Sequence, residues 1–334
     1  MRKVHIRTSL RPIIMLTGPD FKQKQIIFAL ISDGDKMSFK NDNIIITDAE
    51  GVIKHQSTCY RLFALFIVGH ICITSGLLQR SEKFGFSIIF MTHGLRVYGF
   101  WGLNNKGNVL LRRKQYDYKG LEIARRIVSN KINNQLEALK SIRQKSRDTQ
   151  EAIVNITRYQ GRLPENILTL QDLLGYEGIV SRIYFKSLFN ECGWTARRPR
   201  VKNDMTNCLL DIGYTLLFNI VEALLNIYGF DLYQGVYHRE FYQRKSLVCD
   251  LVEPIRPVID MRIRKAYNLG QIKEDDFEMV DGQFRLYGKI SKPYIGWLME
   301  ELLSRKKDIF LFMQGYYRAF MKDAPINQYP QFNL

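Results

Sequence analysis

The chain has 334 residues, of which 46% are hydrophobic, and this apolar content excludes a largely disordered protein. Its 49 Lys and Arg outnumber its 33 Asp and Glu, for a formal net charge of +16, which favours a polyanionic partner such as nucleic acid. From charge alone, a merely soluble basic protein is the alternative. None of the five cysteines forms a CxxC pair, so we expect buried thiols in a reducing, cytoplasmic setting rather than a zinc knuckle or a disulfide framework.

The N-terminal part of the chain has the texture of a β domain. A basic leader, residues 1–22, comes first and lacks the long apolar stretch of a signal peptide. Short β-branched and aromatic runs follow, separated by Gly, Asp and Asn, which is typical of hairpins. The runs are 26–32, 43–47, 52–56, 62–68, 87–91 and 95–100, with one short helix at about 74–83. We therefore predict a β-rich, sandwich-like domain over residues 1–107, including the leader.

One apolar segment, from Leu62 to Leu78, could be mistaken for a membrane span. It is slightly shorter than the roughly 20 residues that a span needs, and it contains His70, Thr74 and Ser75. A buried strand that runs into the start of a helix explains the segment better. We predict no association with a membrane.

The texture changes to helix after residue 107. The stretch 106–147 holds twelve Lys and Arg against three acidic residues, and it is either a solvated helix face or a surface that binds phosphates. Further helices are predicted at 169–191, 204–228, 246–267 and, in two or three pieces, between 292 and 322. The best supported is 204–228, because Asn203 or Asp204 can cap its start and Gly229 can end it. We predict an α+β fold in which a larger all-α catalytic domain, 108–334, follows the β domain.

Three segments of the helical half carry residues that suit a metal ion. Glu177 lies in the first, 176–185, and the second, 235–241, contains His238, the only histidine of this half. The third, 246–257, places Asp250 and Glu253 three residues apart, on one face of a helix. Carboxylates with one imidazole suit Mg²⁺ or Mn²⁺, and such an ion neutralises the charge that develops in phosphodiester transfer.

Each of these residues also has a structural interpretation. A lone histidine is more often a hydrogen-bonded structural residue, Glu177 can form an ion pair with Arg182, and the acid pair can form one with Arg256. Nothing in the spacing brings Glu177 near His238, which follows 61 residues later. The three segments become specific only when they are considered together.

Four motifs in order resemble the CRISPR-associated integrase, the DNA-joining subunit of spacer acquisition in prokaryotic adaptive immunity. They are E-G-x-x-x-R-x-Y-F from Glu177, N-D-x-x-N-x-x-L-x-x-G-Y-x-x-L from Asn203, G-x-x-H ending at His238, and S-L-x-x-D-L-x-E-P-x-R-P from Ser246. The stretch GHICITSGLL at 69–78 is similar to the family's strand and short helix. The resemblance covers nearly the whole chain, and no motif is broken at a ligand position.

The resemblance implies a function and a set of site residues. Glu177, His238 and Glu253 would be metal ligands, and Asp250 a neighbouring catalytic acid that shares the ion through water. In the implied transesterification, the 3′-hydroxyl of a foreign DNA attacks a phosphodiester at the edge of a CRISPR repeat, with an associated metal-dependent endonuclease activity. A non-catalytic DNA-binding scaffold of the same fold is the alternative. An RNA-processing enzyme is disfavoured, because the sequence carries no signature of RNA-stacking aromatics.

The resemblance also implies partners. They are double-stranded DNA (foreign DNA and the CRISPR repeat), a second copy of the chain in a homodimer joined through the β domain, and a small ferredoxin-fold subunit that bridges two dimers. The leader is longer than the family's β domain needs, and it is either an extra strand or an arm that contacts DNA or a partner. Candidate DNA contacts are Arg112, Arg113, Lys114, Arg182, Arg197, Arg198, Arg200, Lys202, Arg244 and Lys245.

Overall fold

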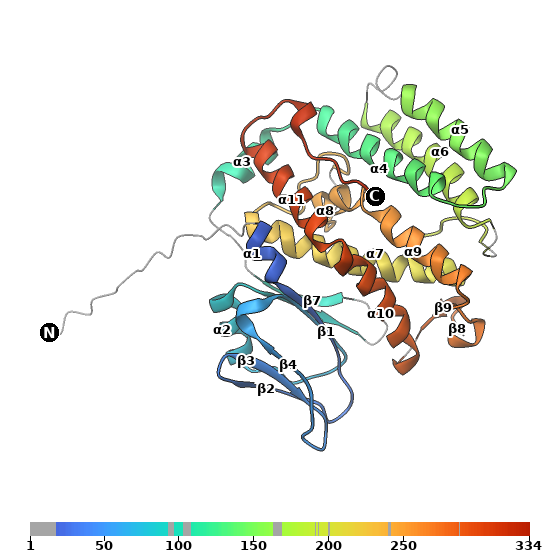
Figure 1. Cartoon of the computed structure of the whole chain (residues 1–334). Helices are drawn as coiled ribbons and strands as arrows, with labels where there is room; N and C mark the ends of the chain where they lie inside the picture. The colour runs from blue at the N-terminus through green and yellow to red at the C-terminus, as the bar shows by residue number, and fades with distance from the viewer. Residues whose placement is uncertain are drawn as a thin grey trace.

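A computed structural model describes residues 18–334, apart from 93–96, 103–107, 163–168, 191, 193, 200, 240–241 and 287. Figure 1 shows a strand-rich region at one end of the molecule and a larger helical region packed on it. This arrangement confirms the predicted α+β fold class. The predicted domain boundary at residue 107 lies outside the described residues.

The larger sheet has the order β1-β5-β6-β7 and is mostly parallel. Its strands are β1 (Gln25–Leu30), β5 (Leu62–Val68), β6 (Ser87–Met91) and β7 (Val97–Trp101). The pairs β1·β5 and β5·β6 are parallel and β6·β7 is antiparallel, so the hairpin prediction is wrong for the first two pairs and confirmed for the third. Parallel neighbours need a crossover, and α2 (Ser75–Phe84) supplies the one between β5 and β6. The strand and helix predicted within Leu62–Leu78 are thereby confirmed.

The smaller sheet is an antiparallel meander of β2 (Lys36–Lys40), β3 (Asn43–Thr47) and β4 (Ile53–Thr58). Ile44 and Ile46 of β3 share a buried cluster with Leu65 and Ile67 of β5, which makes the domain sandwich-like. All seven residues of β5 are buried, because the other face of this strand packs on the core of the helical region. A continuous apolar run is the pattern of a strand that is covered on both faces.

Part of the predicted leader is a short helix, α1 (Gly18–Gln23). Its Phe21 is buried, and its ring stacks on Phe310 of α11 (Lys306–Met321) with 4.4 Å between centroids. The same ring meets Phe63 of β5 edge-on at 5.0 Å. Residues 18–22 therefore join the two regions rather than forming an extra strand, and residues 1–17 lie outside the described part of the chain.

The helical region is built around α7 (Met205–Tyr228), which contacts α8, α9, α10 and α11. As predicted, Asp204 caps its start by accepting from Asn207 N, and the helix ends at Gly229. This helix is long and apolar enough to cross a membrane, but 78% of its most apolar window is buried inside the protein, as in a core helix. The other helices are α3 (Val109–Asp117), α4 (Glu122–Lys140), α5 (Arg147–Arg162), α6 (Leu170–Leu188), α8 (Ser246–Val252), α9 (Arg256–Asn268) and α10 (Gly288–Ser304).

Two predictions about the helical half are corrected. The single helix expected at 246–267 is two helices, because Pro254 lacks the backbone N–H that a continuous helix requires. The half is also not entirely α, because β8 (Glu278–Val280) and β9 (Gln283–Arg285) form a hairpin. The turn of this hairpin is Asp281-Gly282, a dipeptide that favours hairpin turns.

Hydrogen bonds connect helix α4 to Pro254, at the break between α8 and α9, and to the backbone of Phe332. Asn134 Nδ2 donates to Pro254 O at 2.7 Å and to Phe332 O at 2.8 Å. One turn earlier, Asn130 exchanges two hydrogen bonds with the backbone of Phe332, each of 2.8 Å. These bonds hold α4 beside Glu253, and α4 also packs on α6, the helix that carries Glu177.

Candidate active site

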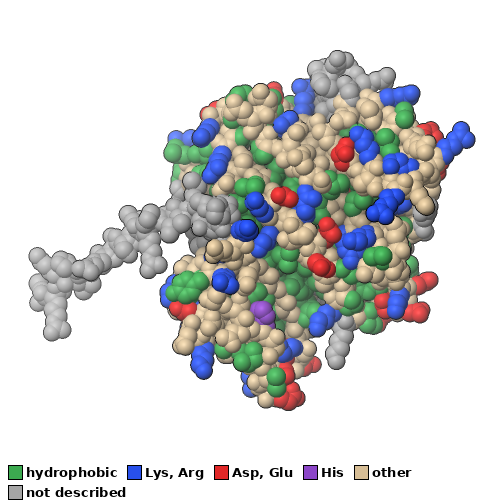
Figure 2. Space-filling view, in the orientation of Figure 1, with side chains coloured by type: hydrophobic (Ala, Val, Ile, Leu, Met, Phe, Trp, Pro, Cys, Tyr) green, Lys and Arg blue, Asp and Glu red, His purple; other side chains and the backbone are tan. Residues whose placement is uncertain are grey.

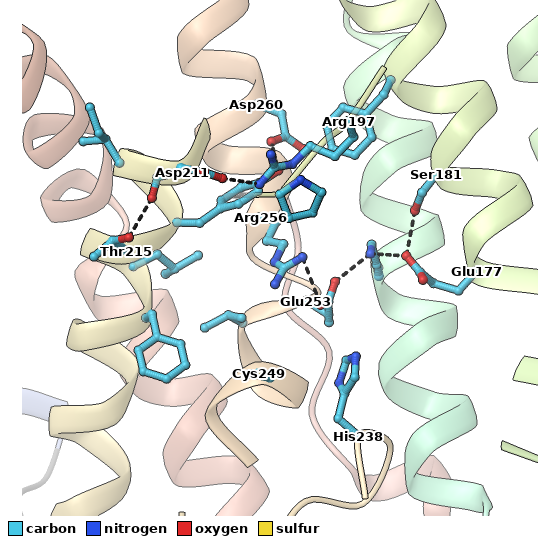
Figure 3. A pocket seen from close by; sticks show the side chains of 18 of the residues that line it. Glu177, Ser181, Arg197, Asp211, Thr215, His238, Cys249, Glu253, Arg256 and Asp260 are labelled. Atoms are coloured by element: carbon cyan, nitrogen blue, oxygen red, sulfur yellow. Dashed lines mark hydrogen bonds and ion pairs between the residues drawn. The ribbon is translucent and has the colours of Figure 1, made fainter. Parts of the chain in front are cut away.

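The three predicted metal ligands line one cavity. Glu177 comes from α6, Glu253 from the end of α8, and His238 from the loop before α8. The cavity has a volume of about 1920 Å³ and is also lined by residues of α4 and α7. Figure 3 shows the side chains of Glu177, Glu253 and His238 projecting toward a common region. The tertiary structure therefore brings together residues whose sequence spacing predicted no proximity.

A buried lysine that belongs to none of the sequence motifs lies between the two glutamates. Lys131 of α4 donates to Glu177 Oε1 and, at 2.6 Å, to Glu253 Oε2. Ser181, one turn along α6, also donates to Glu177 Oε1 at 2.7 Å. The expected ion pair between Glu177 and Arg182 is not formed; Glu177 pairs with Lys131 instead. A signal was present in the sequence, because Lys131 falls on the same buried stripe of α4 as Ile127 and Ile132.

Glu253 is ionised over a wide pH range. Burial opposes the charged form, but the guanidinium of Arg256 and the ammonium of Lys131 outweigh burial and lower the pKa of Glu253 to about 2. Arg256 Nη1 lies 3.1 Å from Glu253 Oε1, so the predicted pairing of Arg256 with an acid of this motif is confirmed. Each oxygen of Glu253 therefore faces a cation.

Asp250 holds the loop that carries His238. Its Oδ2 accepts from the backbone N–H of Val236 at 2.7 Å and of Tyr237 at 2.9 Å. Its Oδ1 accepts from His238 N at 2.9 Å and lies 2.8 Å from His238 Nδ1. Gly235 is required for this close approach, since a Cβ atom there would lie 2.8 Å from Asp250 Oδ2. The spacing G-x-x-H is thus explained by a tight loop around a fully buried carboxylate.

The carboxylate selects which ring nitrogen of His238 is available to an ion. A carboxylate accepts only, so the bond makes Nδ1 the N–H donor and leaves the lone pair on Nε2. Figure 3 shows the imidazole pointing toward Glu253. Asp250 does not line the cavity, and both of its oxygens are engaged, so these contacts favour a positioning role. Ion sharing through water stays a prediction.

The side chains of Glu177, His238 and Glu253 suit a divalent ion chemically, but in this structure their ligand atoms do not surround one common point. Within the described ranges, no three His, Cys, Asp or Glu side chains are arranged to hold an ion as they stand. Two carboxylates and an imidazole are suitable ligands for Mg²⁺ or Mn²⁺. The ammonium of Lys131 already bridges the two carboxylates, which marks the space between them as one that a cation stabilises.

The predicted DNA contacts separate into two groups. Arg182, Arg197, Lys202, Arg244 and Lys245 line the cavity. Two of them have carboxylate partners there: Arg197 pairs with Asp211 at 2.6 Å, and Lys245 with Glu222. Arg198 is exposed and lies next to Arg197. Arg200 lies outside the described residues.

The second group, on α3, does not line the cavity. Arg112 Nε donates to Gly229 O at 3.2 Å, and Lys114 Nζ donates to Met321 O at 2.9 Å. These two residues therefore bind carbonyl groups at the ends of α7 and α11, while Arg113 between them is exposed. Figure 2 shows Lys and Arg side chains interspersed with Asp and Glu on the helical region rather than in one continuous stripe.

Comparison with known proteins decides the family. The sequence matches the profile of the family described as "CRISPR associated protein Cas1" over residues 28–298. The chain belongs to the Cas1 family. It is 27% identical over 274 residues to the CRISPR-associated endonuclease Cas1 1 of Thermodesulfovibrio yellowstonii, covering 78% of this chain and 86% of that relative. It is 31% identical over 206 residues to the protein of the same name from Pyrobaculum aerophilum, covering 59% and 68%.

Solved structures share the Cas1 fold of this chain. A CAS1 protein from Thermotoga maritima superposes with a TM-score of 0.75 at 20% identity, covering 89% of this chain and 97% of that one. A casposase bound to integration product gives 0.74 at 16% identity, covering 92% and 94%. A chain of a Cas6-RT-Cas1–Cas2 complex gives 0.78 at 22% identity, covering 93% of this chain and 36% of that chain.

In this Cas1 chain, two tyrosines of the sequence motifs form hydrogen bonds to Asp260, a buried aspartate next to the site. Tyr214 donates to Asp260 Oδ1 at 2.5 Å and Tyr184 to Oδ2 at 3.1 Å. Burial raises the pKa of Asp260 to about 6 despite these two hydrogen bonds. The guanidinium of Arg256 stacks over the Tyr214 ring, 4.9 Å from its centroid. Tyr214, itself held by Asp260, thus positions Arg256, which in turn pairs with Glu253.

Proposed function

We propose that this Cas1-family chain is a metal-dependent integrase of CRISPR spacer acquisition, with an associated DNA endonuclease activity. In this reaction the 3′-hydroxyl of a foreign DNA attacks a phosphodiester at the edge of a CRISPR repeat. One observation supports the proposal above all others. Glu177, His238 and Glu253, which come from three separate motifs, line one cavity together with basic side chains. The description of the relatives as endonucleases supports an enzymatic rather than a scaffolding role.

The carboxylates of Glu177 and Glu253 and the Nε2 atom of His238 would hold Mg²⁺ or Mn²⁺. When bound, the ion would supply Lewis-acid stabilisation of the charge on the phosphoryl group and its leaving oxygen. Asp250 would keep the imidazole in the correct orientation and tautomer through its 2.8 Å bond to Nδ1. Ser181 would orient Glu177 through its bond to Oε1.

The basic residues that line the cavity would bind the DNA backbone. Arg182, Lys202 and Arg244 face the same cavity as the candidate ligands, so phosphates held there would lie beside the ion. Contacts of this kind position a duplex without reading its sequence. A phosphodiester is therefore the substrate group that the chemistry of the cavity fits.

The proposed partners are a second copy of the chain and a small ferredoxin-fold subunit. A complex described as Cas6-RT-Cas1–Cas2 contains a chain of the same fold, which supports assembly with a partner protein. We expect a homodimer in solution. Sedimentation that finds only a 39.2 kDa species at micromolar concentration would contradict it.

A strand-joining assay tests the function directly. A duplex with 3′-hydroxyl ends is incubated with a supercoiled plasmid carrying a CRISPR repeat, with and without Mn²⁺, and joined product is measured. We expect joining only with the ion, loss of joining in Glu177→Gln, and retention in Glu137→Gln, an exposed carboxylate of α4 outside the cavity. DNA binding without joining under every condition would instead favour the scaffold.

A further inference from the structure

Lys131 has an environment that the proposed reaction does not by itself explain. Its ammonium group is buried and contacts one oxygen of each glutamate, Glu177 Oε1 and Glu253 Oε2. The three residues come from three helices or helix ends that are distant in the sequence, and the candidate ion would bind to the same two carboxylates. A resident cation therefore lies between the groups that the ion would use.

Electrostatics explain why a cation lies there. Two carboxylates at close range repel each other, and a buried ammonium without partners is equally unfavourable. The three groups stabilise one another only as a set, and Arg256 adds a second positive charge on the other oxygen of Glu253. With Lys131 and Arg256 present, the two glutamates are close to neutralised before any divalent ion binds.

We propose that Lys131 is a resident counter-cation that keeps Glu177 and Glu253 assembled in the metal-free protein and competes with the divalent ion for their oxygens. This inference rests on the proposed function, because it assumes that these two glutamates are the ligands. An incoming ion must displace the ammonium from at least one carboxylate. Lysine suits such an exchange, because its ammonium is a compact charge on a flexible four-carbon stem, and its side chain borders an open cavity into which it can move.

The packing of α4 makes the proposal testable, because other residues hold this helix in place. Asn134 bonds to Pro254 O and Phe332 O, and Gln135 Nε2 donates to Ser181 Oγ at 3.3 Å. These contacts connect α4 to both ligand-bearing segments without Lys131. Replacing the ammonium by an apolar group of similar length changes the charge of the site more than the packing of the helix.

The test uses the full-length Lys131→Met protein stripped of metal with a chelator. Mn²⁺ affinity is measured by titration calorimetry, and melting temperature is measured with and without Mn²⁺. We expect Lys131→Met to melt lower than wild type without metal, because two carboxylates are left facing each other. We expect it to bind Mn²⁺ at least about tenfold more tightly, since removing a unit charge beside a divalent ion is worth more than the ~1.4 kcal/mol of one factor of ten. Mn²⁺ should therefore raise its melting temperature by more than that of wild type.

Two further variants serve as controls. Lys140→Met removes an exposed lysine of the same helix that pairs with Glu137, and this variant should behave as wild type. Lys131→Arg keeps the positive charge and should not bind Mn²⁺ more tightly than wild type. If Lys131→Met is folded only when Mn²⁺ is present, the ion has replaced the lysine as the counter-cation and the proposal is supported.

The outcomes separate this inference from the proposed function. Wild-type protein that binds Mn²⁺ while Lys131→Met binds it equally or more weakly would overturn the counter-cation role and leave the metal site standing. Lys131→Met that does not fold even with Mn²⁺ would also overturn it, because the lysine would then be structural. Failure of wild type, Lys131→Met and Lys131→Arg alike to bind Mn²⁺ would overturn the metal dependence itself.

Discussion

The Nδ1 atom of His238 lies 2.8 Å from Oδ1 of Asp250, and the same carboxylate accepts three backbone N–H groups of the loop 236–238. One fully buried side chain thus sets the path of the loop, the direction of the imidazole and the nitrogen that carries the proton. Asp250 follows His238 by twelve residues, and it contacts the cavity lining through that histidine.

Asp250→Asn should therefore weaken the site without removing a ligand. The amide group places a donor where the loop also donates, so the loop and the imidazole lose their fixed orientation. We expect strand joining and Mn²⁺ affinity to fall by about 10–100-fold, as is typical when a residue that orients a metal ligand is lost. Joining rates and calorimetry measure the two effects. Unchanged values in both would show that the carboxylate does not orient His238.

His238→Ala should have a larger effect on joining. Loss of a direct ligand removes stabilisation of the transition state worth several kcal/mol, and each 1.36 kcal/mol is about tenfold in rate. We expect a drop of about a thousandfold or more, with DNA affinity largely kept because phosphates are held by Lys and Arg. Near-normal joining in the presence of Mn²⁺ would sink the assignment, and a variant that does not fold would favour the structural interpretation of this histidine.

The salt dependence of DNA binding should identify the surface that contacts phosphates. Each neutralised phosphate contributes about −0.9 to the slope of log affinity against log salt. We expect a slope steeper than about −2 for wild type and a reduction in its magnitude of about 1 for Arg244→Ala, which lines the cavity. Arg113→Ala, on α3 outside the cavity, should leave the slope unchanged. The reverse pattern would move the DNA to the α3 surface.

Gly213 of α7 should tolerate no side chain. A Cβ atom there would lie 2.5 Å from Ile259 Cγ2 and 3.2 Å from Leu298 Cδ2, so Gly213→Ala forces α7 away from α9 and α10. We expect a loss of about 1–3 kcal/mol in the free energy of unfolding. Gly175→Ala is the matched control: it lies on the exposed side of α6 with nothing within 4 Å, and it should gain about 0.5–1 kcal/mol. Denaturant unfolding of both variants checks the pair, and equal effects would contradict the packing argument.

Local signals accounted for those parts of the fold that a few consecutive residues encode. The boundaries of α7 were predictable because its cap, Asp204, and its end, Gly229, lie next to the apolar stripe that they delimit. The buried strand β5 and the following helix α2 were predictable for the same reason, since a continuous apolar run is followed by a change of period. The resemblance carried by four motifs in order along the chain implied the ligand candidates Glu177, His238 and Glu253.

Contacts between distant residues could not be read from such signals. The parallel pairing of β1 with β5 depends on a crossover through β2–β4, and no pattern within either strand states it. Lys131 belongs to the basic stretch 106–147, which the sequence predicts to be either a solvated helix face or a surface that binds phosphates. In the structure it contacts Glu177, 46 residues away, and Glu253, 122 residues away. The packing of α4 on α6 and on the α8–α9 break buries the ammonium of Lys131. Because an unpaired buried ammonium is unfavourable, the group pairs with the two carboxylates instead of facing solvent. The same holds for Lys114, whose ammonium donates to Met321 O at the end of α11, 207 residues later.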